Sequence, residues 1–302
     1  MTIPRTAPTM SFFESQRPAA GDRVLTLELG PLQIELGSLD DALAAVLHAR
    51  YSPYSSLEPA DATEALRVRV GLEDRDYFID PPKTPMLNRV ILTCDGDRIR
   101  YLGYRVAGWF DTSGGRGELL LARGGFEPPE RAIENYVRSA VAWQAASRGG
   151  ALIHAASAVW KDRAYLFYGE SGAGKSTLSA ANTRARIVSD DLSLVLPSSE
   201  GSLDLVGSPF RGTYEEGAPV QGRFPLVAGF RIIKDDRAEV RPVSRVRAMS
   251  ELVGNLPFVA EAFPKRPDLF DGVQRAFAAI ELAHLHFRKD DSYWEAIEKA
   301  GL

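Results

Sequence analysis

Residues 169–177 constrain this chain more than any other segment, because they fit the pattern G-x-x-x-x-G-K-[ST] of a phosphate-binding loop. In such a loop the glycines let successive backbone N–H groups converge on an anion, and the helix that follows points its positive end at the same place. Lys175 is then expected to reach the β- and γ-phosphates of a nucleotide, and the Ser176 hydroxyl is expected to bind Mg²⁺.

The residues on either side of the loop fit the strand and the helix that this motif requires. Residues 165–168 are an apolar, aromatic run typical of a buried strand, and residues 177–181 can begin a helix. A glycine-rich turn without a ligand is the alternative. The pattern favours a nucleotide site in which ATP is contacted by Gly169, Glu170, Ser171, Gly172, Ala173, Gly174, Lys175, Ser176 and Thr177.

Two adjacent carboxylates, Asp190 and Asp191, follow the loop after room for only one short helix. The apolar residues before them predict a strand that delivers both aspartates to the carboxyl edge of a sheet, where α/β folds bind ligands. Phosphoryl transfer has a use for both, since one carboxylate can hold Mg²⁺ and the other can accept the proton of an attacking hydroxyl. Ser176 and Asp191 are the candidate metal ligands, although the spacing leaves the two roles interchangeable. The alternative is that the pair only begins a turn.

The loop, residues 188–191 and His154 together resemble the kinase domain of HPr kinase/phosphorylase and its relatives, which share a core with phosphoenolpyruvate carboxykinase. Residues 151–159, which contain His154, resemble the strand that carries a functional histidine in this family. Residues 285–290 resemble the ends of these relatives. The resemblance covers residues 149–302, and it implies ATP- and Mg²⁺-dependent phosphorylation of a hydroxyl, typically that of serine, on a protein, a peptide or a small molecule.

The chain also departs from this family. Its first half does not align with the amino-terminal domain of bacterial HPr kinase, and the signature that supports the reverse, phosphorylase reaction is missing after the acidic pair. Oxaloacetate-binding features of the carboxykinase are missing as well. We therefore expect a kinase whose acceptor is not HPr. A regulatory ATPase that acts as a nucleotide switch and a kinase of a small molecule such as free serine are the alternatives.

Two further residues are candidates for the catalytic site. His154 can bind a phosphate or a metal, or orient the attacking hydroxyl, although a histidine in an apolar strand is often a hydrogen-bonded core residue. Arg211, in the loop of residues 208–213, can clamp a transferring phosphoryl group. The alternative for Arg211 is a solvated side chain on a surface turn.

Two pairs of residues are weaker candidates for metal ligands. Glu215 and Glu216 can help to bind a second metal, or can form a solvated acidic turn. His284 and His286 share one face of a predicted strand, but the sequence near them offers no third ligand at a suitable spacing.

Composition narrows the classes of partner and compartment. The 36 basic and 40 acidic residues are closely balanced and form no long block of like charge, so neither nucleic acid nor an acidic membrane is an expected partner. The single cysteine, Cys94, excludes an internal disulfide and fits a reducing compartment. Apolar runs of membrane-spanning length are lacking, which favours a cytoplasmic location. The family resemblance also makes a homo-oligomer conceivable.

The expected fold is α/β (α+β), with a P-loop kinase domain built on a mixed sheet and preceded by a smaller β-rich domain. Residues 1–22 hold three prolines and no hydrophobic core of a signal peptide, and we interpret them as a flexible tail. Residues 23–148 are the β-rich domain, for which substrate recognition is a candidate role, and residues 149–302 are the kinase-like domain. The pattern predicts strands over 24–29, 32–36, 66–70, 89–94, 98–102 and 118–122 and helices over 40–50 and 129–147.

Overall fold

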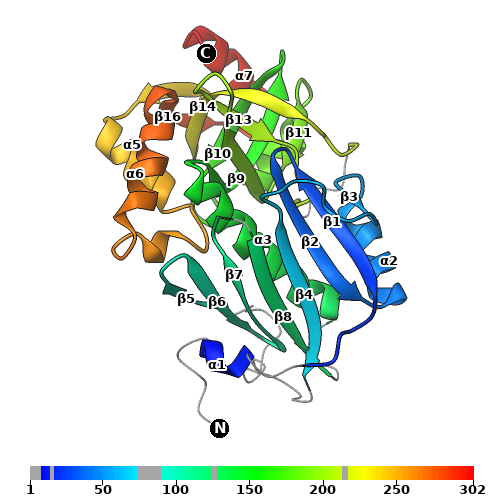
Figure 1. Cartoon of the computed structure of the whole chain (residues 1–302). Coiled ribbons are helices and arrows are strands. Elements are labelled where there is room, and N and C mark those ends of the chain that lie inside the picture. The colour runs from blue at the N-terminus through cyan, green and yellow to red at the C-terminus, as the bar shows by residue number, and fades with distance from the viewer. Residues whose placement is uncertain (1–7, 14–16, 74–89, 114, 124–127, 213–216) are drawn as a thin grey trace. The chain divides into compact units, whose positions relative to one another are not determined.

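The computed structural model describes residues 8–13, 17–73, 90–113, 115–123, 128–212 and 217–302. The fold is mixed α/β, and the chain divides into two compact units, Met1–Gln144 and Ala145–Leu302 (Figure 1). The division falls inside a helix, shortly before the boundary that the sequence places after residue 148. Within the described residues, no helix combines the length and the apolar character needed to cross a membrane.

The first unit is built on one eight-stranded sheet with the order β3-β1-β2-β4-β8-β7-β6-β5. The pairs β2–β4 and β4–β8 are parallel, and the other pairs are antiparallel. The β-rich character and the two predicted hairpins are confirmed, whereas β3 and β7 were not predicted. The strands are β1 (Arg23–Leu29), β2 (Leu32–Leu39), β3 (Ser55–Ser56), β4 (Leu66–Glu73), β5 (Ile91–Asp95), β6 (Arg98–Gly103), β7 (Val106–Asp111) and β8 (Gly115–Ala122).

The helices of this unit are α1 (Met10–Phe13), α2 (Asp41–Tyr51) and α3 (Pro129–Ser147), the last with the bounds that the sequence predicts. The Asp40 carboxylate accepts a hydrogen bond from the N–H of Leu43, which caps the start of α2. Tyr136 of α3 is buried, and its hydroxyl donates to the carbonyl of Trp109 at 2.8 Å. This bond ties α3 to β7 and satisfies a polar atom in the core.

The second unit contains a small barrel. Strands β10, β9, β12, β13 and β14 pair in this order, and β14 pairs back to β10, which closes a ring of five strands. Strands β16 and β15 continue the sheet from β14, and β11 pairs with β9 beside β12. The strands are β9 (Ala151–Trp160), β10 (Arg163–Tyr168), β11 (Arg186–Ser189), β12 (Leu192–Pro197), β13 (Leu203–Val206), β14 (Arg223–Lys234), β15 (Glu239–Pro242) and β16 (Glu281–Phe287).

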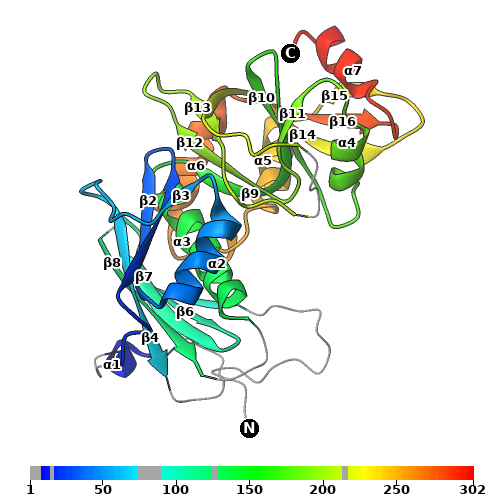
Figure 2. The same ribbon diagram turned by 90° about the vertical axis from the view of Figure 1, so that its right-hand side faces the viewer.

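Helices cover both faces of the sheet formed by β10, β14 and β16 (Figure 2). On one face Phe167 and Phe230 pack with residues of α4 and α7, including Trp294. On the other face the neighbours Arg231 and His284 contact Glu251 of α5. The helices of this unit are α4 (Lys175–Ala181), α5 (Arg245–Val253), α6 (Pro267–Ala276) and α7 (Tyr293–Lys299), with short 3₁₀ helices at Ala260–Ala262 and Phe277–Ala279.

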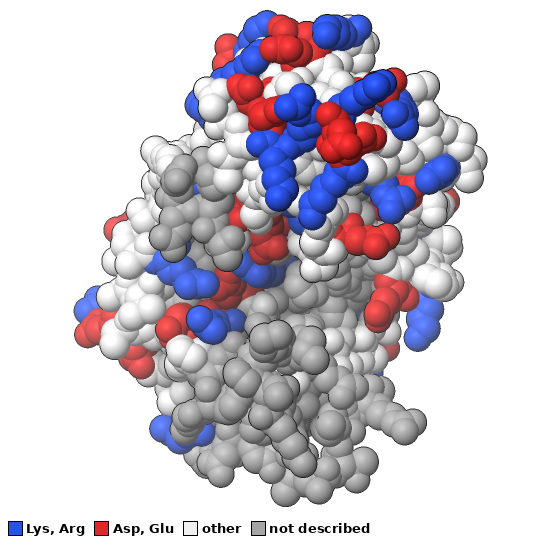
Figure 3. All heavy atoms as spheres, turned by 180° about the vertical axis from the view of Figure 1, so that it is seen from behind, with Lys and Arg blue, Asp and Glu red and all other residues white. Residues whose placement is uncertain are grey.

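Ion pairs surround α7 on the surface. Arg184 contacts Asp291 at 3.1 Å and Glu295 at 3.0 Å, and Lys161 contacts Glu298 at 2.6 Å. Basic and acidic side chains are intermixed at the α7 end of the face drawn in Figure 3. Because exposed pairs of this kind contribute only about 0–1 kcal/mol each, α7 is held mainly by its buried aromatic residues.

The directions of the strands bring several chain segments to one edge of the second unit. Strands β10, β14 and β16 are parallel, and β10 and β11 are both antiparallel to β9. The carboxyl ends of β10, β11, β14 and β16 therefore lie at the same edge. His154 reaches this edge as well, because the last residue of β10, Tyr168, pairs with Ala155 in the first half of β9.

Replacing Phe230 with alanine should destabilise the second unit by about 3–5 kcal/mol. The ring is fully buried against Phe167, so its removal leaves a cavity. Chemical denaturation checks this value. The matched control is Val246→Ala, where the side chain is 83% exposed and a change within about 0.5 kcal/mol is expected. Equal losses in the two variants would contradict the packing described for Phe230.

Candidate functional site

The loop of residues 169–177 connects β10 to α4, so the strand–loop–helix arrangement that the motif requires is present. Gly172 and Gly174 have φ angles of 80° and 110°, in the left-handed region that favours glycine. At Gly174 two features disfavour a side chain: the positive φ angle, and the Phe287 ring, which would lie 2.8 Å from an added Cβ. The loop can therefore lie directly against the end of β16.

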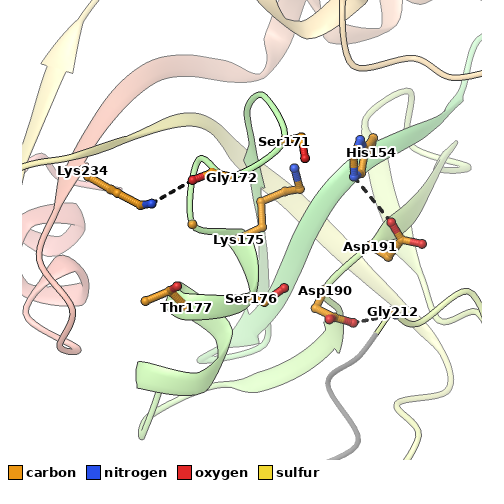
Figure 4. Close-up of a pocket in the computed structure, with 11 residues that line it drawn as sticks. His154, Ser171, Gly172, Lys175, Ser176, Thr177, Asp190, Asp191, Gly212 and Lys234 are labelled. Atoms are coloured by element: carbon orange, nitrogen blue, oxygen red, sulfur yellow. Dashed lines mark hydrogen bonds and ion pairs between the residues drawn. The ribbon is translucent and has the colours of Figure 1, made fainter. Parts of the chain in front are cut away.

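A cavity of about 440 Å³ opens beside the loop (Figure 4). The loop contributes Ser171, Gly172, Gly174, Lys175, Ser176 and Thr177 to its lining. The rest of the lining comes from His154, Asp190, Asp191, Gly212 and Lys234. The structure thus brings together in one cavity the loop, the acidic pair and the histidine, which the sequence analysis had grouped as candidate site residues.

Three predicted contact residues shape the loop instead of lining the cavity. The carbonyl of Gly169 accepts a hydrogen bond from Lys175 Nζ at 2.9 Å. The N–H of Ala173 donates to the carbonyl of Glu170 at 3.0 Å, which closes the turn. The Glu170 side chain is 87% exposed and lies 3.3 Å from Arg231 of β14. Glu170 therefore contributes to the loop through its backbone and through an ion pair on the surface.

Two ammonium groups reach the cavity, and each is held by a loop carbonyl. Lys175 Nζ donates to Gly169, and Lys234 Nζ donates to Gly172 at 2.8 Å. Burial lowers the pKa of Lys175, and the nearby Asp191 carboxylate acts in the opposite direction. Lys234 was not predicted. The signal that identifies it is a lysine at the end of an apolar strand that runs parallel to the loop strand.

The acidic pair lies where strand β9 changes partners. Ser189 of β11 pairs with Ser157 of β9, whereas Leu192 of β12 pairs with His154 farther along the same strand. Asp190 and Asp191 form the bend between these two pairings. Hydrogen bonds fix the bend, since Ser189 Oγ donates to the carbonyl of Phe210 at 2.9 Å and accepts from the N–H of Asp191 at 3.1 Å.

The two carboxylates have different surroundings. Asp190 is 4% exposed, and its Oδ1 accepts a hydrogen bond from the N–H of Gly212 at 2.7 Å. A Cβ at Gly212 would lie 2.9 Å from Asp190 Oδ2, so a larger residue there would require the carboxylate to shift. The Asp191 side chain is 30% exposed, and its Oδ1 lies 3.5 Å from Nε2 of His154. Asp190 is thus held by the backbone, and Asp191 faces the open part of the cavity.

A hydrogen bond fixes the backbone of His154, and the pKa of its imidazole is lowered. The backbone N–H donates to the carbonyl of Asn255 at 2.8 Å. Burial lowers the pKa of His154 from its ordinary value, Lys175 lowers it further, and Asp191 partly offsets both effects. The lowered pKa favours the neutral imidazole, in which one ring nitrogen can accept a hydrogen bond.

Arg211 does not line the cavity in the structure. Its Nη1 donates to the carbonyl of Gly217 at 3.2 Å, while the next residue, Gly212, does line the cavity. A role for Arg211 in clamping a phosphoryl group stays a prediction.

The weaker metal candidates are not brought together. Nε2 of His284 contacts Glu251 at 2.7 Å, and Nδ1 of His286 contacts Asp235 at 2.7 Å, so each histidine has its own carboxylate. In the parts of the chain that the structure describes, no group of three or more His, Cys, Asp or Glu side chains is arranged to hold a metal ion. Glu215 and Glu216 lie outside the described residues.

The residues of the cavity nevertheless fit Mg²⁺. This ion prefers hard oxygen ligands, and it is usually held by one or two carboxylates together with waters and substrate phosphates. Ser176, Asp190 and Asp191 offer one hydroxyl and two carboxylates in the lining of the same cavity. A protein cage of three or more ligands is not needed for an ion that a nucleotide brings with it.

The pKa of His154 can be followed by NMR, with the signal assigned through a His154→Gln variant. We expect a midpoint below the ordinary value of 6.5. Lys175→Met should raise the midpoint, because it removes a positive charge that disfavours the imidazolium. Asp191→Asn should lower it, because it removes the charge that favours the imidazolium. A midpoint that neither substitution moves would contradict the electrostatic contacts described here.

No model of a known protein family matches the chain, and no curated protein is similar to it. Conclusions about function therefore depend on the geometry described above.

Proposed function

We propose that this protein is an ATP- and Mg²⁺-dependent kinase that phosphorylates a serine hydroxyl on a protein or peptide. The observation that carries the proposal is the shared cavity, in which a phosphate-binding loop, its lysine and two carboxylates face one space. Phosphoryl transfer depends mainly on positioning and on electrostatic stabilisation, so these groups are the ones the reaction needs. The resemblance to HPr kinase-like proteins in residues 149–302 agrees with this function.

The loop supplies the nucleotide contacts. Its backbone N–H groups and Lys175 bind the phosphates, and the Lys175 ammonium group leaves the Gly169 carbonyl to do so. When bound, Mg²⁺ neutralises charge on the β- and γ-phosphates. Ser176 and Asp191 are its proposed protein ligands, since Asp191 is partly exposed and a hydrated ion can reach it.

The acceptor hydroxyl approaches from the side of the cavity that holds His154 and the acidic pair (Figure 4). Asp190 is the proposed general base, because its carboxylate lines the cavity while the Gly212 N–H fixes its orientation. The ring N–H of neutral His154 can donate a hydrogen bond to the oxygen of the same hydroxyl and hold it in place while the proton moves to Asp190. The β-rich first unit is the proposed site of acceptor recognition.

Lys175→Ala should lower the rate of phosphate transfer by about 10²–10³-fold or more, because a phosphate-binding cation is lost. The measurement uses γ-labelled ATP with Mg²⁺, the purified protein and a desalted extract of its source cells, and it follows label in protein, peptide and small-molecule fractions.

The control is Lys161→Ala, since this lysine is 65% exposed in a surface ion pair. Label released only as inorganic phosphate would contradict the proposed kinase and identify an ATPase instead. Label confined to the small-molecule fraction would contradict a protein or peptide acceptor.

Replacing each aspartate with asparagine separates the two proposed roles. Asp190→Asn should lower kcat by about 10²–10⁴-fold at every Mg²⁺ concentration, because the base is removed. Asp191→Asn should instead raise the Mg²⁺ concentration needed for half-maximal activity, because a ligand is lost. Asp162→Asn is the matched control, with a side chain 96% exposed. The reverse pattern of Mg²⁺ dependence would exchange the two assignments.

A further inference from the structure

A second cavity, of about 950 Å³, adjoins the first. It is lined by Thr177 at the start of α4, by residues 234–236 at the end of β14 and by residues 287–289 at the end of β16. Thr177 and Lys234 line both cavities. The two spaces therefore meet at the end of the phosphate-binding loop.

The direction of the loop determines which end of a bound triphosphate would lie in each cavity. The lysine of such a loop reaches the β- and γ-phosphates, while the backbone N–H groups cradle the α- and β-phosphates. His154 and Asp191 lie on one side of the loop, and Thr177 and Lys234 lie on the other side (Figure 4). A triphosphate whose γ-end faces the acidic pair therefore extends its α-end toward Thr177 and the second cavity.

We propose that the second cavity holds the ribonucleoside half of the nucleotide, with Lys234 contacting the phosphate chain where the two cavities meet. This inference rests on the proposed function of the first cavity. Lys234 is placed for this contact, since its Nζ is already within hydrogen-bond distance of the loop at Gly172. A phosphate oxygen next to Gly172 would replace the carbonyl as its partner.

The charged residues of this cavity fit a nucleoside and its phosphates. Lys234, Arg288 and Lys289 are cations in the lining of this cavity, and Lys234 lies where it meets the first cavity. Arg288 also contacts Asp290 at 3.1 Å. The Asp236 side chain makes no hydrogen bond or ion pair with any other described residue, and it is exposed. Its carboxylate can accept hydrogen bonds from ribose hydroxyls or from a base amino group.

Asp235 has a different task from its neighbour. Its Oδ2 contacts Nδ1 of His286 at 2.7 Å, and its Oδ1 accepts from the N–H groups of Asp236 at 2.7 Å and Arg237 at 3.3 Å. These bonds fix the turn after β14. Asp235 therefore positions Asp236, and Asp236 is the residue that meets the ligand.

The acceptor of the phosphoryl group does not fit this second cavity. An attacking hydroxyl has to reach the acidic pair, and Asp190 and Asp191 line only the first cavity. The second cavity opens at Thr177, at the far end of the loop from His154. A nucleoside is therefore the occupant that the geometry favours.

The test compares the affinity of the full-length protein for ATP and for inorganic tripolyphosphate by calorimetry. The wild-type protein should bind ATP more tightly, because tripolyphosphate lacks the nucleoside. Asp236→Ala should weaken ATP binding by about tenfold or more, as expected for a hydrogen bond to a charged group, and leave tripolyphosphate binding unchanged. Lys234→Ala should weaken the binding of both ligands. Asp162→Ala, at the turn between β9 and β10, is the control that should change neither.

The outcomes distinguish this inference from the proposed function. If the wild-type protein binds neither ligand, or if Lys175→Ala binds both as tightly as wild type, the phosphate site itself is wrong. If the phosphate site is present but Asp236→Ala weakens both ligands equally, or neither, the assignment of the second cavity is wrong. Equal affinity of the wild-type protein for ATP and tripolyphosphate would also overturn it.

Photo-crosslinking locates the nucleoside without relying on a substitution. The probe is 8-azido-ATP, and the modified peptides are mapped by mass spectrometry with tripolyphosphate as competitor. We expect label in the segments that contain residues 234–236 or 287–289, and loss of this label with excess tripolyphosphate. Competed label at His154 or in the first unit would overturn the proposal.

Discussion

The parallel pairing of β10 with β14 brings the phosphate-binding loop and Lys234 to the same edge of the second unit, and the pairing of β9 with β10 adds the groups carried by β9 and β11. Strands β10 and β14, together with β11 and β16, end at one edge of the second unit, and the loop, the acidic pair and Lys234 each follow one of these strands. The end of a strand fixes where the next chain segment begins. Groups from distant parts of the sequence can therefore meet around one cavity without a long flexible loop to bring them together.

The polar groups around this cavity have partners within the protein. The Asp190 carboxylate has the Gly212 N–H, and the ammonium groups of Lys175 and Lys234 have loop carbonyls. Lys175 and Asp190 are buried, so leaving either of these two groups unpaired would cost about 1–3 kcal/mol. A side chain at Gly212 would come too close to Asp190, and one at Gly174 would come too close to Phe287. These contacts therefore limit the residues that can occupy the two glycine positions.

Local patterns predicted much of this structure, whereas contacts between distant segments were missed. The loop motif, the hairpins and helix α3 depend on residues close together in the sequence, and the structure contains them. Lys234 and Gly212 were missed because their place depends on how β14 and the segment after β13 are arranged in space. The barrel was missed for the same reason, since its closure depends on the pairing of β10 with β14. Strand β7 was missed because Ala107 and Gly108 interrupt the alternating pattern.

The hydrogen bonds of the two lysines make ligand binding an exchange of partners. A ligand that enters the loop has to replace the carbonyl groups of Gly169 and Gly172 as well as its own shell of water. A small monovalent anion such as chloride offers a single acceptor atom, so it gains little by displacing a carbonyl. A polyphosphate presents oxygens to both lysines at once. The phosphate site that we propose would therefore favour anions with several oxygens, before any base or sugar is recognised.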